Sequence, residues 1–161
     1  MKNLNATYKG LLTGGLMIFF SILIFLKKDS IDNPLIYIVY CTYIAGIIWT
    51  LLIFKSSADH KSFKLFFSEG FKCFIVGTLL IVIFTWFFYR YNTTFRDSLL
   101  KTYRNDLINQ KNRTPTEIED KILDAKGKFL IIRTFIAILG YLVVGTLTTV
   151  IGSAFLSQKK V

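Results

Sequence analysis

The sequence contains very few of the side chains that bind metals or carry out catalysis. It has one histidine, His60, which lies in a polar stretch, and two cysteines among 161 residues. A single histidine excludes a histidine-based metal site and a Ser–His–Asp triad. The sequence also lacks a glycine-rich phosphate loop and the CxxC and HExxH motifs. We therefore expect no catalytic residue, no metal and no cofactor, and we predict that the protein is not an enzyme.

Acidic residues are also scarce, at 10 against 20 lysines and arginines, and none lies in the middle of four long apolar runs. A helix needs about 20 mostly apolar residues to cross a bilayer. The runs therefore predict an all-α integral membrane protein, a four-helix bundle that contacts lipid and forms one domain over residues 1–161. A small four-span proton-coupled pump needs an acid near mid-membrane, so this class is disfavoured. The predicted spans cover about residues 8–26, 34–54, 65–89 and 129–156.

The two cysteines lie in separate spans, displaced from the membrane centre toward opposite sides. The resulting offset between Cys41 and Cys73 exceeds the roughly 7 Å limit on the Cα separation in a disulfide. We expect no disulfide, and we interpret both cysteines as small buried residues.

Proline is rare, and both prolines stand where a helix is expected to begin. Pro34 opens the second span, with Asp32 or Asn33 as its N-cap. The segment Thr114–Glu117 matches a capping box with proline at the first helical position.

Charge is concentrated in residues 90–128, which hold nine basic and six acidic residues. Their apolar positions recur at helical spacing, so we predict a helical hairpin outside the membrane, between the third and fourth spans. Its second helix is expected to run on toward the fourth span and to loosen at Gly127. A solvated charged loop is the alternative. The periodic positions are Phe95, Leu99, Leu100, Tyr103 and Leu107 in the first helix and Ile118, Ile122 and Leu123 in the second.

Small residues share a face in three of the spans. Such faces let helix backbones approach closely, which drives helix association in lipid. We expect them to pack the spans of one chain together, with homodimerisation as the alternative. The positions are Ala6, Gly10 and Gly14 in the first span, Gly70 and Gly77 in the third, and Gly145, Thr149 and Ser153 in the fourth.

Aromatic residues gather at the end of the third span. Tryptophan and tyrosine beside an arginine are typical of the belt at a membrane interface. Within the second span, Tyr37, Tyr40 and Tyr43 form a stripe that indicates a packed or interfacial face, or the lining of a pocket. The belt residues are Trp86, Tyr89, Arg90 and Tyr91.

Three ionisable residues fall inside the predicted spans, and residues of this kind are candidates for function. Glu69 and Lys72 are three positions apart and can pair on one helix face. They form either an interfacial ion pair, whose lysine reaches the headgroups, or a proton or cation site. Arg133 lies about one turn inside the fourth span, where its side chain can also reach the interface.

The net charge of +10 is attributed to anchoring at anionic headgroups, and no nucleic-acid partner is expected. Seven lysines and arginines flank the spans on each side, so the positive-inside rule does not decide the orientation. The sparsely acidic N-terminus and the Lys159–Lys160 tail favour cytoplasmic termini.

Three segments resemble an uncharacterised family. They are Asn5–Leu11, Phe66–Phe71 and the ending from Gly145 through Gly152–Phe155. The family is the small four-span bacterial membrane proteins grouped as domain of unknown function 4199. The resemblance covers essentially the whole chain and implies the fold and a bacterial inner membrane, but no reaction.

Two functions remain open from the sequence. The first is a non-enzymatic membrane subunit or scaffold that docks a partner protein of the membrane or envelope through the hairpin. The second is a small transporter or ion-binding protein that uses Glu69 and Lys72.

Overall fold

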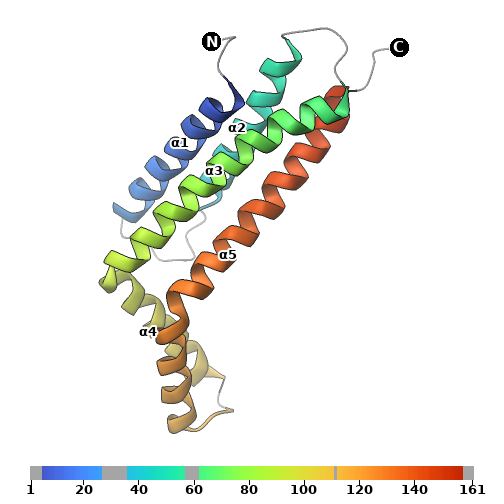
Figure 1. Ribbon diagram of the computed structural model, residues 1–161. Helices are drawn as coiled ribbons and strands as arrows, with labels where there is room; N and C mark the ends of the chain where they lie inside the picture. The colour runs from blue at the N-terminus through green and yellow to red at the C-terminus, as the bar shows by residue number, and fades with distance from the viewer. Residues whose placement is uncertain (1–4, 27–35, 57–61, 111, 158–161) are drawn as a thin grey trace. The chain divides into compact units, whose positions relative to one another are not determined.

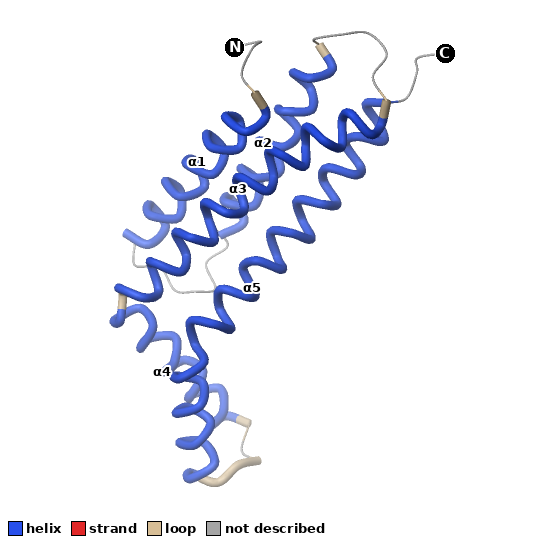
Figure 2. The backbone as a smooth tube through the Cα atoms, in the orientation of Figure 1, coloured by secondary structure: helices blue, strands red, loops and turns tan. Residues whose placement is uncertain are grey.

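The computed structural model describes residues 5–26, 36–56, 62–110 and 112–157. Within these ranges the chain is helical apart from short connections and helix ends, with no strand, as predicted (Figure 1, Figure 2). Four of the five helices are long and apolar enough to cross a membrane, and α4 is the exception. The protein is therefore a multi-pass membrane protein. The helices are α1 (Ala6–Leu26), α2 (Ile36–Lys55), α3 (Phe63–Tyr91), α4 (Thr93–Asn109) and α5 (Pro115–Ser157).

Two sequence predictions fall outside the described residues. These are the helix start at Pro34 with its cap at Asp32 or Asn33, and the place of His60 in a polar loop.

The fourth span and the second arm of the hairpin are one helix. α5 runs for 43 residues and stays helical through Gly127, so the expected loosening there is wrong. A Cβ atom built on Gly127 would meet nothing within 4 Å. A glycine in an uncrowded helix interior lowers helix propensity by only about 1 kcal/mol, which does not break a helix of this length.

The chain forms two compact units. Unit 1 comprises residues 1–82 and 138–161, and unit 2 comprises residues 83–137. Unit 1 thus contains α1, α2, most of α3 and the second half of α5. Unit 2 contains the end of α3, all of α4 and the first half of α5.

In unit 1, α2 and α3 are in direct contact along their length. The Tyr43 hydroxyl oxygen lies 2.7 Å from Oγ1 of Thr78, and the rings of Phe54 and Phe66 meet edge to face at 5.3 Å between centroids. α1 and α5 each pack against both central helices, through glycines described below. The result is a four-helix bundle whose outward side chains are largely apolar, as lipid contact requires.

The structure corrects one cysteine prediction. Cys73 is buried, but Cys41 is exposed. The buried face of α2 passes through Val39, Tyr43 and Ile47, at spacings of four residues. Cys41 lies between two of these positions, which places it on the opposite side of the helix.

Unit 2 has a small core of its own. Leu99 and Leu100 from α4 pack with Phe129 from α5, and partly buried Tyr89, Phe95 and Ala125 surround them. Leu107 and Ile118 are also buried. The predicted periodicity therefore identifies most of the packed face. The hairpin is the segment 90–128, as defined from the sequence, and it is folded rather than a loop.

Two periodic positions of the hairpin do not belong to that face. Leu123 is 73% exposed and Tyr103 is 41% exposed. The inner face of α5 follows Ile118, Ile122 and Ala125, at spacings of four and three residues. Leu123 is one residue beyond Ile122, or about 100° around the helix, so it points away from the core.

Candidate functional site

Glu69 and Lys72 form an ion pair near the start of α3. Nζ of Lys72 lies 2.7 Å from Oε1 of Glu69. The carboxylate side chain is 19% exposed and the lysine side chain is 49% exposed. The pair therefore places a mostly buried carboxylate beside a lysine that reaches the surface of unit 1.

Lys9 is a further lysine inside unit 1, and it is more deeply buried than either member of that pair. Only 3% of its surface is exposed. The buried face of α1 consists of Ala6, Lys9, Gly10, Thr13, Gly14 and Met17. Lys9 thus lies within the stripe of small residues and not on the outer, lipid-facing side of the helix.

A group of buried polar side chains lies beside Lys9. Oγ1 of Thr50 is 3.2 Å from Sγ of Cys73 and 2.9 Å from the carbonyl oxygen of Gly46. Thr13 packs directly against Gly46, and its hydroxyl donates to the carbonyl oxygen of Lys9 at 2.8 Å. Thr13 and Lys9 share the buried face of α1. Three helices therefore contribute to one polar cluster.

Tyr43 connects three helices deeper in unit 1. It is fully buried, and its hydroxyl lies 2.7 Å from Oγ1 of Thr78. The same oxygen is 3.2 Å from the carbonyl oxygen of Tyr141 and 3.3 Å from that of Phe74. Of the sequence-predicted tyrosine stripe, Tyr43 is therefore a packed residue, and Tyr37, at 67% exposed, is an outward one.

Thr149 and Ser153 occupy successive turns of α5 and are fully buried. Among the described residues, neither hydroxyl has a hydrogen-bond partner. Thr50, Cys73 and Lys9 are buried in the same half of unit 1, where α1 begins and α5 ends. Most buried polar groups of unit 1 therefore lie in that half.

The small-residue positions lie where helices meet within the chain. A Cβ on Gly10 would be 2.6 Å from the carbonyl oxygen of Cys73, and one on Gly14 would be 2.6 Å from a Leu80 methyl. A Cβ on Gly70 would be 2.6 Å from the Thr149 methyl. Gly145 and Gly77 make room for the ring and hydroxyl of Tyr43. These faces are therefore occupied by helices of the same chain.

Arg133 and the aromatic belt belong to unit 2. The Arg133 guanidinium carbon lies 5.7 Å from the centroid of the Phe129 ring, and the side chain is half-buried. Tyr89 is also half-buried, and its ring meets Phe129 edge to face at 5.5 Å. The other belt residues are exposed: Trp86, Arg90 and Tyr91.

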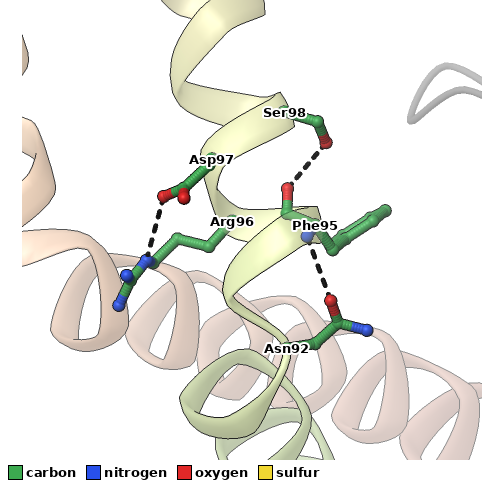
Figure 3. Close-up of polar contacts among 5 residues, drawn as sticks. All are labelled: Asn92, Phe95, Arg96, Asp97 and Ser98. Atoms are coloured by element: carbon green, nitrogen blue, oxygen red, sulfur yellow. Dashed lines mark hydrogen bonds and ion pairs between the residues drawn. The ribbon is translucent and has the colours of Figure 1, made fainter.

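The first arm of the hairpin begins at a side-chain cap (Figure 3). Oδ1 of Asn92 accepts a hydrogen bond from the backbone N–H of Phe95 at 3.0 Å. One turn on, the Ser98 hydroxyl donates to the carbonyl oxygen of Phe95 at 2.7 Å, and Nε of Arg96 lies 3.6 Å from Asp97. The cap satisfies a backbone donor that a helix start otherwise leaves free.

The second arm begins at the predicted capping box. The Thr114 N–H donates to Oε2 of Glu117 at 2.8 Å, and the Glu117 N–H donates to the Thr114 hydroxyl at 3.3 Å. The hydrogen bond from the Thr114 backbone favours the ionised carboxylate and lowers the pKa of Glu117 below its ordinary value. An ion pair between Arg104 of α4 and Glu119 of α5 joins the two arms.

No group of three or more histidine, cysteine, aspartate or glutamate side chains that could hold a metal ion occurs in the described part of the chain.

Comparison with known families gives one match. The family described as "Protein of unknown function (DUF4199)" matches residues 8–158. The chain belongs to this family. No curated protein and no solved structure matches it. The matched region of this DUF4199 chain includes Lys9, the Glu69–Lys72 pair and the whole hairpin.

Sequence reasoning missed Lys9 as a buried residue of the DUF4199 chain. Its place among basic residues near a span end suggested an anchor in the headgroups. The overlooked signal is its spacing, because Lys9 is three residues after Ala6 and four before Thr13, on the face predicted to pack. Gly46 and Gly152 were also missed as packing positions, although Thr42, Gly46 and Thr50 fall every fourth residue in the second span.

Proposed function

We propose that this protein is a non-enzymatic membrane subunit that docks a partner protein of the membrane or envelope through its hairpin. The main observation behind the proposal is that the hairpin is a folded structural element with stabilising contacts of its own. It has its own core at Leu99, Leu100 and Phe129, a cap at the start of each arm, and an ion pair between the arms. A connection that only joins two spans needs none of these features.

The outer surface of the hairpin carries apolar side chains among charges. Leu123 is 73% exposed, Ile108 is 51% exposed and Tyr103 is 41% exposed. Their neighbours in sequence include exposed lysines and carboxylates, so this surface is outside the hydrocarbon layer and lipid tails do not cover it. Exposed apolar and aromatic side chains rimmed by charge are typical of protein interfaces.

The charge of the hairpin suggests the chemistry of the partner. Nine basic residues exceed six acidic ones in residues 90–128. Electrostatic complementarity therefore favours a partner surface that is acidic around an apolar centre. By analogy alone, a membrane-bound glycosyltransferase or an envelope-assembly complex is the kind of partner that a small four-span protein serves.

The test is capture of the partner from native membranes by the full-length chain. Replacing residues 95–124 by a short flexible linker should abolish capture and leave membrane insertion intact. Leu123→Asp should weaken capture about tenfold or more, the effect expected when a charge is placed in an interface, and should leave the hairpin core in place.

Thr116→Asp is the matched control, because it places the same charge at an exposed polar position on the same arm. Capture that survives the linker replacement would rule out docking through the hairpin.

A second candidate function is ion binding or transport by unit 1. It is favoured by the partly buried Glu69–Lys72 pair and by the buried hydroxyls in the same half of the bundle. A water path to these groups would let a charged thiol reagent modify Cys73 in the folded protein, with the outward-facing Cys41 as the comparison. A Cys73 thiol that reacts only after unfolding would count against transport.

The proposal includes a location and an assembly. We place the protein in a bacterial inner membrane with both termini cytoplasmic, from the resemblance and the lysine-rich ends. Homodimerisation through the small-residue faces is disfavoured, because those faces already pack helices of one chain.

A further inference from the structure

We infer that α1 and the start of α3 form a binding site for a phosphate group, in which Lys9 and Lys72 supply the positive charge. The inference is independent of docking by the hairpin. It begins from the burial of Lys9, which is 3% exposed. In the described residues, carboxylates pair with Lys72, Arg96, Arg104 and Lys128, and none pairs with Lys9.

The two helices are in close register here. A Cβ on Gly10 would be 2.6 Å from the carbonyl oxygen of Cys73, and one on Gly14 would be 3.4 Å from Cα of Gly77. Gly10 is thus level with Cys73, and Gly14, four residues later, is level with Gly77. α1 and α3 therefore run in the same direction. One turn earlier, Ala6 is level with Glu69. Because side chains of a helix lean toward its N-terminus, the Lys9 side chain is directed to the level of Glu69.

The charges at this level do not balance. Glu69 already has Lys72 as its partner, at 2.7 Å. Lys9 adds a second ammonium to this end of the bundle, and no carboxylate of the described residues forms an ion pair with it. The Glu69 carboxylate therefore faces two ammonium groups, and the local net charge is positive. A positive site favours binding of an anion, whereas Glu69 alone would suggest a cation.

Phosphate is the anion that best fits the position. Lys72 is half-exposed, and Lys64, two turns earlier in α3, is exposed. This end of the bundle therefore reaches the polar layer of the membrane, where lipid headgroups present phosphates. Lysine binds the phosphate of a lipid and a phosphate from solution through the same charge-assisted hydrogen bonds.

The experiment uses the full chain in lipid nanodiscs and separates the two sources. In one arm, phosphatidylglycerol is titrated into discs of neutral phosphatidylcholine, and bound lipid is counted by native mass spectrometry. In the other, inorganic phosphate is added to discs of phosphatidylcholine alone, and the unfolding midpoint is measured. The wild type should retain phosphatidylglycerol selectively, or its midpoint should rise with inorganic phosphate. The first result identifies a lipid source and the second a soluble one.

Lys9→Gln should weaken the binding of the responding probe by about tenfold or more, as expected for loss of a charge-assisted hydrogen bond. Lys64→Gln is the matched control, an exposed lysine at the same end, and should bind like the wild type. Lys9→Arg keeps the charge and should retain binding. Equal binding by Lys9→Gln and the wild type would overturn the site. If the Lys9→Gln variant does not insert into the membrane, the wild-type protein alone provides the test. A wild type that neither retains phosphatidylglycerol nor is stabilised by inorganic phosphate would also overturn the site.

Discussion

Gly10 and Gly15 are both in α1, but their surroundings differ completely. A Cβ on Gly10 would lie 2.6 Å from a backbone oxygen of α3, which cannot move without shifting the helix, whereas one on Gly15 would meet nothing within 4 Å. Gly10→Ala should therefore destabilise the protein by about 1–3 kcal/mol through overpacking. Gly15→Ala should leave stability unchanged or raise it by up to about 1 kcal/mol, because alanine favours the helix. Unfolding in mixed micelles measures both, and equal effects would contradict the close approach of α1 and α3.

Tyr43 is the second residue whose role is specific enough to test. Tyr43→Phe keeps the ring in place and removes the hydroxyl that lies 2.7 Å from Thr78. The loss should cost about 1 kcal/mol, the usual value for one buried hydrogen bond. Tyr37→Phe, at a position that is 67% exposed, is the control and should have no effect. The same unfolding assay applies, and a neutral Tyr43→Phe would show that the hydroxyl contacts do not stabilise unit 1.

The sequence anticipated residues of these kinds unequally. Gly10 and Gly14 were predicted from a repeat that is visible in one dimension. Lys9 was not, because a lysine near a span end is equally consistent with burial against a neighbour and with exposure to headgroups. The spacing of Lys9 from Ala6 favours burial, and the packing of the neighbouring helices decides it.

At the scale of elements, the start of α5 depends on a reciprocal cap between Thr114 and Glu117. Thr114→Ala should lower the stability of the hairpin by about 1 kcal/mol. Amide hydrogen exchange in the first turn of α5 should rise, while exchange in α2 stays unchanged. Unaltered exchange at the α5 start would mean that the cap does not hold it.

The same cap makes the hairpin sensitive to acid. The folded-state pKa of Glu117 is lowered, so its stabilising effect is fully present above the ordinary value of 4.5 and is lost as the pH falls through the depressed value. The first turn of α5 should therefore fray at low pH, as read from the backbone amide shifts of Thr114 and Glu117. Glu117→Gln should remove this dependence, and a persistent transition in that variant would assign it to another group.

Elements were predicted well where the pattern is strongly periodic and less well where two elements join. The first three apolar runs match α1, α2 and α3 to within a few residues at each end, because an apolar run long enough to cross a bilayer is a strong signal of a helix. The second arm was expected to run on toward the fourth span, but the loosening predicted at Gly127 is absent, because a change from polar to apolar composition does not by itself break a helix.

For the whole molecule, the orientation can be measured directly. The proposed cytoplasmic termini, together with four spans, require the hairpin to be external. In a background with Cys41 and Cys73 replaced, Asn109→Cys should react with an impermeant thiol reagent in intact cells, and Ser157→Cys should react only after the cells are opened. The reverse pattern would place the termini outside and move the hairpin, with its proposed partner, to the cytoplasm.

The sequence by itself determined that the protein is all-α, that it crosses a membrane, and that a helical hairpin separates the last two spans. These properties follow from length, hydropathy and helical period, which are local in the chain. Only the tertiary structure decided which polar residues are buried together. Lys9, Thr50 and Cys73 come from three helices, and their burial in one bundle depends on how far each helix is rotated toward its neighbours. That rotation is set by packing at glycines such as Gly10 and Gly46, whose partners are distant in sequence.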